Sequence, residues 1–212
     1  MSRRWPSRRK WIGSALTTVG LCGLGIGRAV QERSATSDAQ AIRPPGALAE
    51  SDFLSACVRC GLCVEACPYE TLRLADTGQG VATGTPFFVA REVPCEMCRD
   101  IPCVKACPTG ALAKLLHRID AAQMGSAHLS RPEGCYSFIG AAACTSCYQA
   151  CPLKGTAITM KPGLTRLGGW LTPTVDADIC TGCGKCEKAC IASVAAIAIV
   201  ANRDGPSNPH HR

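Results

Sequence analysis

Cysteines are the residues of this chain with the most distinctive chemistry. Seventeen occur among 212 residues, and an excess of this size indicates a disulfide scaffold, structural zinc or iron–sulfur clusters. Sixteen of them fall into four groups, separated by stretches without cysteine. The spacing inside each group, more than the total, distinguishes these three chemistries.

The first and fourth groups share one spacing, with two, two and then three residues between successive cysteines. This run wraps a loop around one [4Fe–4S] cluster with three thiolates and sends the fourth thiolate to a second cluster. Proline usually follows the run, as Pro68 does in the first group, whereas Ile191 replaces it in the fourth. The predicted ligands in these groups are Cys57, Cys60, Cys63, Cys67, Cys180, Cys183, Cys186 and Cys190.

The second and third groups are variants of the same run. Four residues separate the middle cysteines of the second group, and eight residues separate Cys135 from Cys144 in the third. Both groups end in Cys-Pro. Their predicted ligands are Cys95, Cys98, Cys103, Cys107, Cys135, Cys144, Cys147 and Cys151. The sixteen cysteines are therefore predicted to hold four [4Fe–4S] clusters.

Zinc and disulfides account for this spacing less well. A zinc site closes with two Cys-x2-Cys pairs and needs neither a third cysteine at the same spacing nor a following Cys-Pro. Cysteines two residues apart in a tight loop also pair poorly with one another. Gly61, Gly182 and Gly184 lie between predicted ligands, where the backbone must turn tightly and approach sulfur. Clusters are the favoured interpretation.

Short apolar segments follow each group, at residues 71–74, 111–113, 157–160 and 196–199. They predict a unit of short helix and short strand that is repeated four times. Two such units make a dicluster module, so we expect an α+β fold of two small, loop-rich, ferredoxin-like modules built around clusters. Two longer insertions, 78–88 and 161–176, are expected to be loops that cover a cluster, with a partner surface as the alternative.

The spacing leaves open which groups share clusters. Neighbouring groups can pair, or the second and third can pair inside the first and fourth. We favour the nested arrangement, because the lengthened second group resembles iron–sulfur subunits that nest. Nesting places Cys67 with the fourth group and Cys107 with the third.

Residues 1–41 are interpreted as an export signal. Arg8 and Arg9 are followed by Lys10, Trp11 and Ile12, which resembles the twin-arginine signature. The apolar stretch 12–26 is too short to span a bilayer of ~30 Å comfortably. Cleavage near residue 41 and retention as a membrane anchor both remain open. The protein is therefore expected to be periplasmic and possibly attached to the membrane by this segment, and Cys22 within it is not a predicted ligand.

Three segments follow from these boundaries. Residues 42–200 are predicted to form the four-cluster part. The run from Arg43 to Gly46, just ahead of the first cysteine group, is interpreted as a linker between the signal and the folded part, because Pro-Pro-Gly interrupts regular structure. Residues 201–212 are expected to be a disordered polar tail.

The net charge of +7 does not indicate a nucleic-acid partner. Seven basic and two acidic residues lie within residues 1–41, which leaves +2 for the rest. Thiolate-bound clusters add negative charge, so the mature holoprotein is expected to be acidic. We therefore exclude a nucleic-acid function.

Longer strings make a family resemblance specific. Beyond the twin-arginine start, they are residues 43–47 (RPPGA), 56–61 (ACVRCG), 84–91 (GTPFFVAR), 94–98 (PCEMC) and 180–188 (CTGCGKCEK). With them the chain resembles the ferredoxin-type proteins encoded with methylamine utilisation and with periplasmic nitrate reductase. The match extends over essentially the whole sequence.

The resemblance implies an electron carrier, not an enzyme. Such a protein would pass electrons between a membrane-bound, ferredoxin-like, quinol-oxidising partner and a periplasmic redox enzyme. The brief tail after Cys190 favours methylamine utilisation over nitrate reduction. Two alternatives remain: a maturation factor for a periplasmic redox enzyme, and a redox-enzyme subunit with its own substrate site. The sequence contains no radical-type Cys-x3-Cys-x2-Cys motif and no phosphate-binding glycine loop with lysine.

Overall fold

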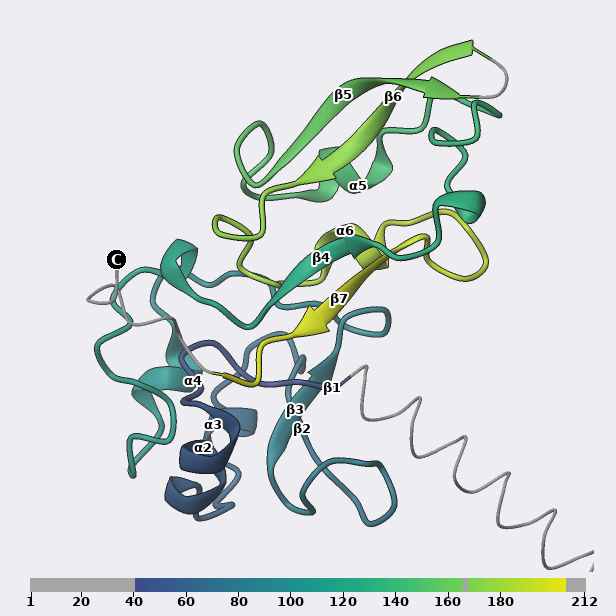
Figure 1. Cartoon of the computed structure of the whole chain (residues 1–212). Coiled ribbons are helices and arrows are strands. Elements are labelled where there is room, and N and C mark those ends of the chain that lie inside the picture. The colour runs from purple at the N-terminus through teal and green to yellow at the C-terminus, as the bar shows by residue number, and fades with distance from the viewer. Residues whose placement is uncertain (1–40, 166–167, 205–212) are drawn as a thin grey trace, which may run out of the picture.

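The computed structural model describes residues 41–165 and 168–204, which form short helices and strands joined by loops (Figure 1). We call residues 41–123 the first module and residues 124–204 the second. The first module contains β1 (Ala41–Ile42), α2 (Glu50–Ala56), α3 (Leu62–Glu65), β2 (Arg73–Leu74), β3 (Pro86–Val89), α4 (Pro102–Lys105) and η1 (Ile119–Ala121). The second contains β4 (Gly125–Leu129), η2 (Pro132–Gly134), α5 (Ser146–Ala150), β5 (Ile158–Thr165), β6 (Gly168–Val175), α6 (Lys185–Lys188) and β7 (Ile197–Ala201).

The sheet of the first module has the order β1-β3-β2 and is antiparallel throughout. Its central strand β3 lies within the insertion 78–88 and continues one residue beyond it. The prediction of a loop there is wrong for residues 86–88. Phe87 and Phe88 are buried, and an apolar run with aromatic residues favours a strand that can bury one face.

Two antiparallel pairs of strands form the sheets of the second module. β4 pairs with β7, so that the chain ahead of the third group meets the chain behind the fourth. β5 pairs with β6 over eight residues each and forms a hairpin at one end of the molecule (Figure 1). The prediction of a loop over residues 161–176 is therefore wrong, because most of that segment is paired strand that satisfies its own backbone.

The predicted repeat is present in the helices. α3, α4, α5 and α6 each carry the third cysteine of a group, and α3 packs on α4 as α5 packs on α6. Strands follow the first, third and fourth groups. The apolar segment 111–113 behind the second group instead forms an isolated bridge, between Leu112 and Ala47. The helices of the described residues run for seven residues or fewer, and none has the length and apolar character of a membrane span.

Residues 43–46 belong to the folded core, so the linker prediction is wrong. Arg43 is 7% exposed; its Nε donates to Glu50 at 2.9 Å and its guanidinium to the Thr85 hydroxyl at 2.8 Å. The same guanidinium lies 4.7 Å from the centroid of the Phe53 ring. Pro and Gly here mark an irregular backbone, which a buried ion pair holds in place.

The chain ends of the described part are also tied to the fold. Ala201 belongs to β7, the Asn202 N–H donates to Met124 at 3.0 Å, and the Glu50 N–H donates to Arg203 at 2.8 Å. The prediction of a disordered tail is therefore wrong for residues 201–204, while 205–212 lie outside the described residues. The predicted signal features Arg8, Arg9 and Cys22 also lie outside them, and Ala41 is already part of β1.

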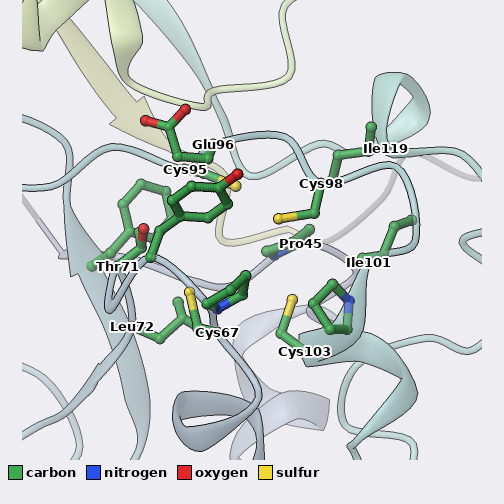
Figure 2. Close-up of a pocket in the computed structure, with 14 residues that line it drawn as sticks. Pro45, Cys67, Thr71, Leu72, Cys95, Glu96, Cys98, Ile101, Cys103 and Ile119 are labelled. Carbon is green, nitrogen blue, oxygen red and sulfur yellow. The ribbon is translucent and has the colours of Figure 1, made fainter.

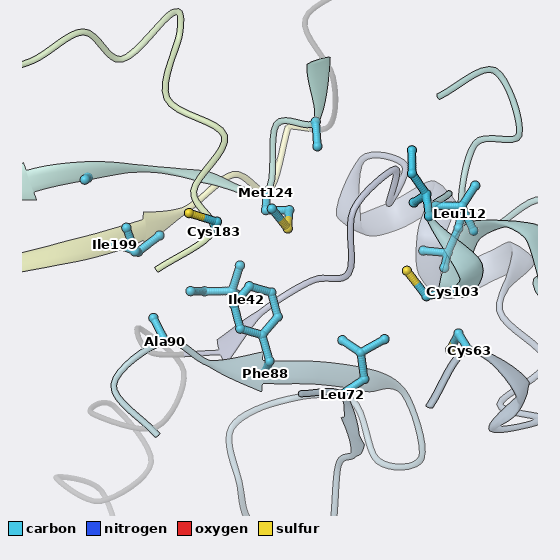
Figure 3. Packing of buried hydrophobic residues seen from close by; sticks show 14 of the residues in the cluster. Ile42, Cys63, Leu72, Phe88, Ala90, Cys103, Leu112, Met124, Cys183 and Ile199 are labelled. Carbon is cyan, nitrogen blue, oxygen red and sulfur yellow. The ribbon is translucent and has the colours of Figure 1, made fainter. Parts of the chain in front are cut away.

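Cysteine thiols form part of the buried core. Phe53 and Phe88 are fully buried. Figure 3 shows Phe88 among aliphatic neighbours, with the thiols of Cys103 and Cys183 in the same packing region. With few aromatic residues elsewhere in the chain, the packing around the thiols accounts for much of the interior.

The two modules meet where residues 90–97 lie against residues 183–192. The Arg91 guanidinium donates to the carbonyls of Glu187 at 2.7 Å, Cys190 at 2.7 Å and Ala192 at 2.8 Å. These carbonyls lie at and beyond the end of α6, where helical backbone lacks partners of its own. Arg91 of the first module therefore caps a helix of the second.

A second contact at this junction is made by backbone. The N–H of Cys95 donates to the carbonyl of Cys183 at 2.8 Å. Gly184 has a φ of +84°, and a Cβ there would lie 2.4 Å from the Cβ of Ala90. Only glycine allows so close an approach between the two modules.

Candidate iron–sulfur sites

Four thiols from two cysteine groups surround one pocket of the first module. Cys95, Cys98 and Cys103 come from the second group, and Cys67 comes from the first. Figure 2 shows the four sulfur atoms pointing into a shared space, with Ile101 and other apolar side chains around it. We call these four cysteines set II.

The remaining cysteines of the first two groups form a matching arrangement. Cys57, Cys60 and Cys63 line a second pocket together with Cys107, and Cys63 interacts electrostatically with all three. We call these four cysteines set I. The first and second groups have thus exchanged their fourth cysteines.

This exchange shows that the nested pairing is wrong. Nesting required Cys67 beside the fourth group and Cys107 beside the third. Each of these cysteines instead follows a short helix by two residues, Cys67 after α3 and Cys107 after α4. Because α3 packs on α4, the residue beyond each helix reaches the cysteine loop of the other.

The second module brings the third and fourth groups together. Cys151 interacts electrostatically with Cys180 and Cys183, and Cys186 interacts with all three. These four cysteines are set III. Their composition repeats the exchange, because the fourth cysteine of the third group lies with three from the fourth.

Set IV contains Cys135, Cys144 and Cys147, and Cys147 interacts electrostatically with both of the others. Cys190 follows α6 by two residues, as Cys107 follows α4, and we assign it to set IV by this equivalence. The eight residues between Cys135 and Cys144 fold back on themselves, with the Ala141 N–H donating to Tyr136 at 2.9 Å. A compact turn thus returns the chain to the other members of the set.

Burial makes several of these thiols poor anions, as their pKa values show. It raises the pKa of Cys63 and Cys147 to about 11 and of Cys95 and Cys103 to about 12, and neighbouring thiolates add to each shift. Four thiolates around one pocket would therefore repel strongly unless a cationic group neutralised them. Iron provides such a group, and binding it releases the thiol protons.

Cys107 differs because hydrogen bonds outweigh the effect of its burial. Burial raises its pKa, but the N–H groups of Leu112, Thr109 and Gly110 and the Thr109 hydroxyl, 3.8 Å away, together lower it. The Ala196 N–H similarly donates to the sulfur of Cys190 at 3.3 Å. N–H donors to ligand sulfur are how proteins hold iron–sulfur clusters and tune their potentials. The residues present therefore fit such a group.

The alternatives fit these cysteines less well. All sixteen in the described part are free thiols, so no disulfide joins them there. In residues 41–165 and 168–204, no three His, Cys, Asp or Glu side chains are placed to hold a single metal ion. Sulfurs bound to one tetrahedral zinc at ~2.3 Å would lie only ~3.8 Å apart. These thiols surround a pocket, as a multi-iron cluster requires.

The two extra residues of the second group are accommodated by a left-handed backbone. Gly61, Ile101 and Gly184 precede α3, α4 and α6, and their φ angles are +78°, +44° and +84°. A β-branched residue is strained in this conformation. Ile101 is nonetheless 3% exposed, so its burial in the wall of set II offsets that strain.

Sequence reasoning missed the residues that position the thiols. Arg91 ends the string 84–91 but had no assigned role, and Thr109 directly follows the Cys107-Pro108 pair. The ion pair between Lys185 and Glu96 was also missed, although it connects the cysteine loops of sets II and III. The signal in the sequence was that Glu96 and Lys185, of opposite charge, each lie inside a cysteine loop.

A family model described as a 4Fe-4S dicluster domain matches residues 56–111 and 142–194. The first range spans the whole first and second groups, and the second spans the fourth group and the third from Cys144 onward. Each range lies within one module that exchanges its fourth cysteines. The comparison and the geometry therefore agree on which groups belong together.

Curated relatives cover nearly the whole chain. The methylamine utilization ferredoxin-type protein MauM of Methylorubrum extorquens is 49% identical over 92% of this chain and 89% of its own length. Ferredoxin-type protein NapG of Escherichia coli is 47% identical over 91% and 85%, respectively. MauM of Paracoccus denitrificans is 46% identical over 98% and 93%. No solved structure matches the chain.

Proposed function

The chain belongs to the family of ferredoxin-type iron–sulfur proteins that contains MauM and NapG, and we propose that it carries electrons through four [4Fe–4S] clusters. The clusters would be held by sets I to IV, in two ferredoxin-like α+β modules. Each cluster would supply one-electron oxidation and reduction. The protein residues set their order and surroundings.

The observation that carries this proposal is the order of the four sets. Within the first module, Cys63 of set I interacts electrostatically with Cys103 of set II. Between the modules, Cys95 of set II interacts with Cys183 of set III. These electrostatic interactions, and the one described next, support a single row, I–II–III–IV.

The last of these electrostatic interactions lies within the second module, between Cys186 of set III and Cys147 of set IV. The modules alone would give two separate pairs of sets. The Arg91 cap and the Cys95–Cys183 hydrogen bond hold set II against set III. This junction turns two pairs into one row, which is what transfer between two different partners requires.

The first end of the row reaches the surface. Cys60 of set I is the one exposed cysteine among those that the structure describes. We propose that a partner exchanges electrons at set I and a second partner at set IV. The partners would be a membrane-bound, ferredoxin-like, quinol-oxidising protein and a periplasmic redox enzyme, with this chain exported to the periplasm by the twin-arginine route. Of the two systems we propose methylamine utilisation, because MauM of Paracoccus denitrificans matches 98% of this chain and 93% of its own length.

The competing function is maturation of the periplasmic enzyme. To separate the two, we would delete the gene and purify the enzyme from the deletion strain. Electron transfer predicts a fully assembled enzyme that turns over with an artificial electron acceptor or donor, while whole cells lose the activity. An enzyme that lacks its cofactor or remains inactive would contradict electron transfer and favour the maturation role.

A further inference from the structure

A basic pocket lies beside set II, on the surface of the first module. It holds about 300 Å³ and is lined by Arg99, Lys105 and Lys114, with buried Ile101 and Val104 beneath them. Asp100 is the single acidic residue in its wall. The extra residues of the second cysteine group thus form part of a concave site with an excess of positive charge. Electron transfer through the thiol sets does not explain this charge.

The three cations of this pocket are not neutralised by the protein. None of them takes part in an ion pair within the described residues, whereas Arg118, in the same loop as Lys114, pairs with Asp120. Lysine and arginine side chains with no carboxylate partner favour an external anion.

The rim of the pocket presents an exposed leucine. Leu115 is 85% exposed, more than any other large hydrophobic residue of the described part. Its neighbour Leu116 packs against the core, which fixes the loop with Leu115 outside. Leu115 stands in the chain between Lys114 and Leu116, which both line the pocket. An exposed apolar side chain next to a basic pocket has the chemistry of a segment that enters the boundary between lipid headgroups and acyl chains.

We propose that this surface, made by Arg99, Lys105, Lys114, Leu115 and His117, docks onto an anionic phospholipid membrane. The pocket would take a phosphate headgroup, and Leu115 would enter the acyl boundary. Charge complementarity between the basic pocket and an anionic headgroup supports a lipid as the occupant. An acidic protein surface would pair with the cations but would not account for the exposed Leu115. α4 lies on the side of the molecule opposite the β5–β6 hairpin (Figure 1), so docking would leave the hairpin free. The proposal is independent of the electron route.

The test measures binding of the full-length holoprotein to vesicles of phosphatidylcholine and phosphatidylglycerol in a roughly two-to-one ratio. We expect Lys105→Gln with Lys114→Gln to lower the partition coefficient about 25-fold, since each cation near an anionic surface contributes about five-fold. Leu115→Thr should lower it several-fold. High salt, or vesicles of phosphatidylcholine alone, should remove the difference between wild type and the lysine variant.

Matched controls separate this surface from general charge. Lys154→Gln with Lys161→Gln removes the same charge from exposed positions elsewhere, and Val200→Thr replaces another exposed apolar residue. Both should bind like wild type, and all variants should keep wild-type iron content. Equal binding by the two double lysine variants would overturn the proposal. The proposal would also be overturned if Lys105→Gln with Lys114→Gln abolished binding to polyglutamate, an acidic polypeptide, and left binding to the vesicles unchanged.

Discussion

Removing iron and sulfide is expected to unfold residues 41–204. Six cysteines belong to the buried core cluster, and the helices of the described part are one or two turns long. Without clusters, the pockets of sets I and II would be lined by thiols that gain little from packing. Binding of structural zinc contributes ~10–16 kcal/mol to the folding of small metal domains. A comparable term here would be as large as the ~5–15 kcal/mol of net stability typical of a domain.

Thermal unfolding followed by near-ultraviolet circular dichroism tests this expectation. The holoprotein should show a cooperative transition, and the protein stripped of iron anaerobically should show none. Adding back iron and sulfide should restore the transition, which controls for damage during stripping. An apoprotein that still unfolds cooperatively near the temperature of the holoprotein would contradict the account, because side-chain packing alone would then suffice.

Paired alanine substitutions should reveal which cysteines share a cluster. Cys67→Ala and Cys95→Ala belong to the same set, so each should lower iron from about sixteen to about twelve per chain, and the double variant should be no worse. Cys67→Ala with Cys180→Ala affects two sets and should leave about eight. Iron analysis of anaerobically purified protein measures the difference.

The control is Cys22→Ala, which should leave the iron content unchanged. The opposite pattern is also informative. If the Cys67 and Cys180 substitutions together cost no more iron than either one, while those of Cys67 and Cys95 add, the groups pair in the nested order. The exchange between neighbouring groups described above would then be wrong.

The sequence defines the members of each cysteine group, because ligand spacing within one loop is local, and their role as cluster ligands stays a prediction. It could not predict which loops exchange their fourth cysteines. That choice depends on the packing of α3 on α4 and of α5 on α6, contacts between short helices that carry no periodic signal. The lengthened second group pointed toward nesting, but its extra residues are absorbed by the left-handed turn at Ile101.

Segments without regular patterning were the other source of error. Arg43 lies in a Pro-Gly-rich run typical of linkers, yet Glu50 and Thr85 neutralise and bury it. Such long-range partners cannot be read from composition. Glycines and prolines interrupt the strands of the β5–β6 hairpin, so its sequence resembles that of a loop. The Arg91 cap joins residues about a hundred positions apart. No local sequence pattern predicts hydrogen bonds over such a separation.

The central claim is that the four sets of thiols hold four [4Fe–4S] clusters in one row. Iron and acid-labile sulfide per chain, with electron paramagnetic resonance after dithionite reduction, test it most directly. The account predicts about sixteen of each per chain, with signals broadened by interaction between neighbouring reduced clusters. Bound zinc, oxidised disulfides without iron, or reduced clusters that show no interaction would contradict it.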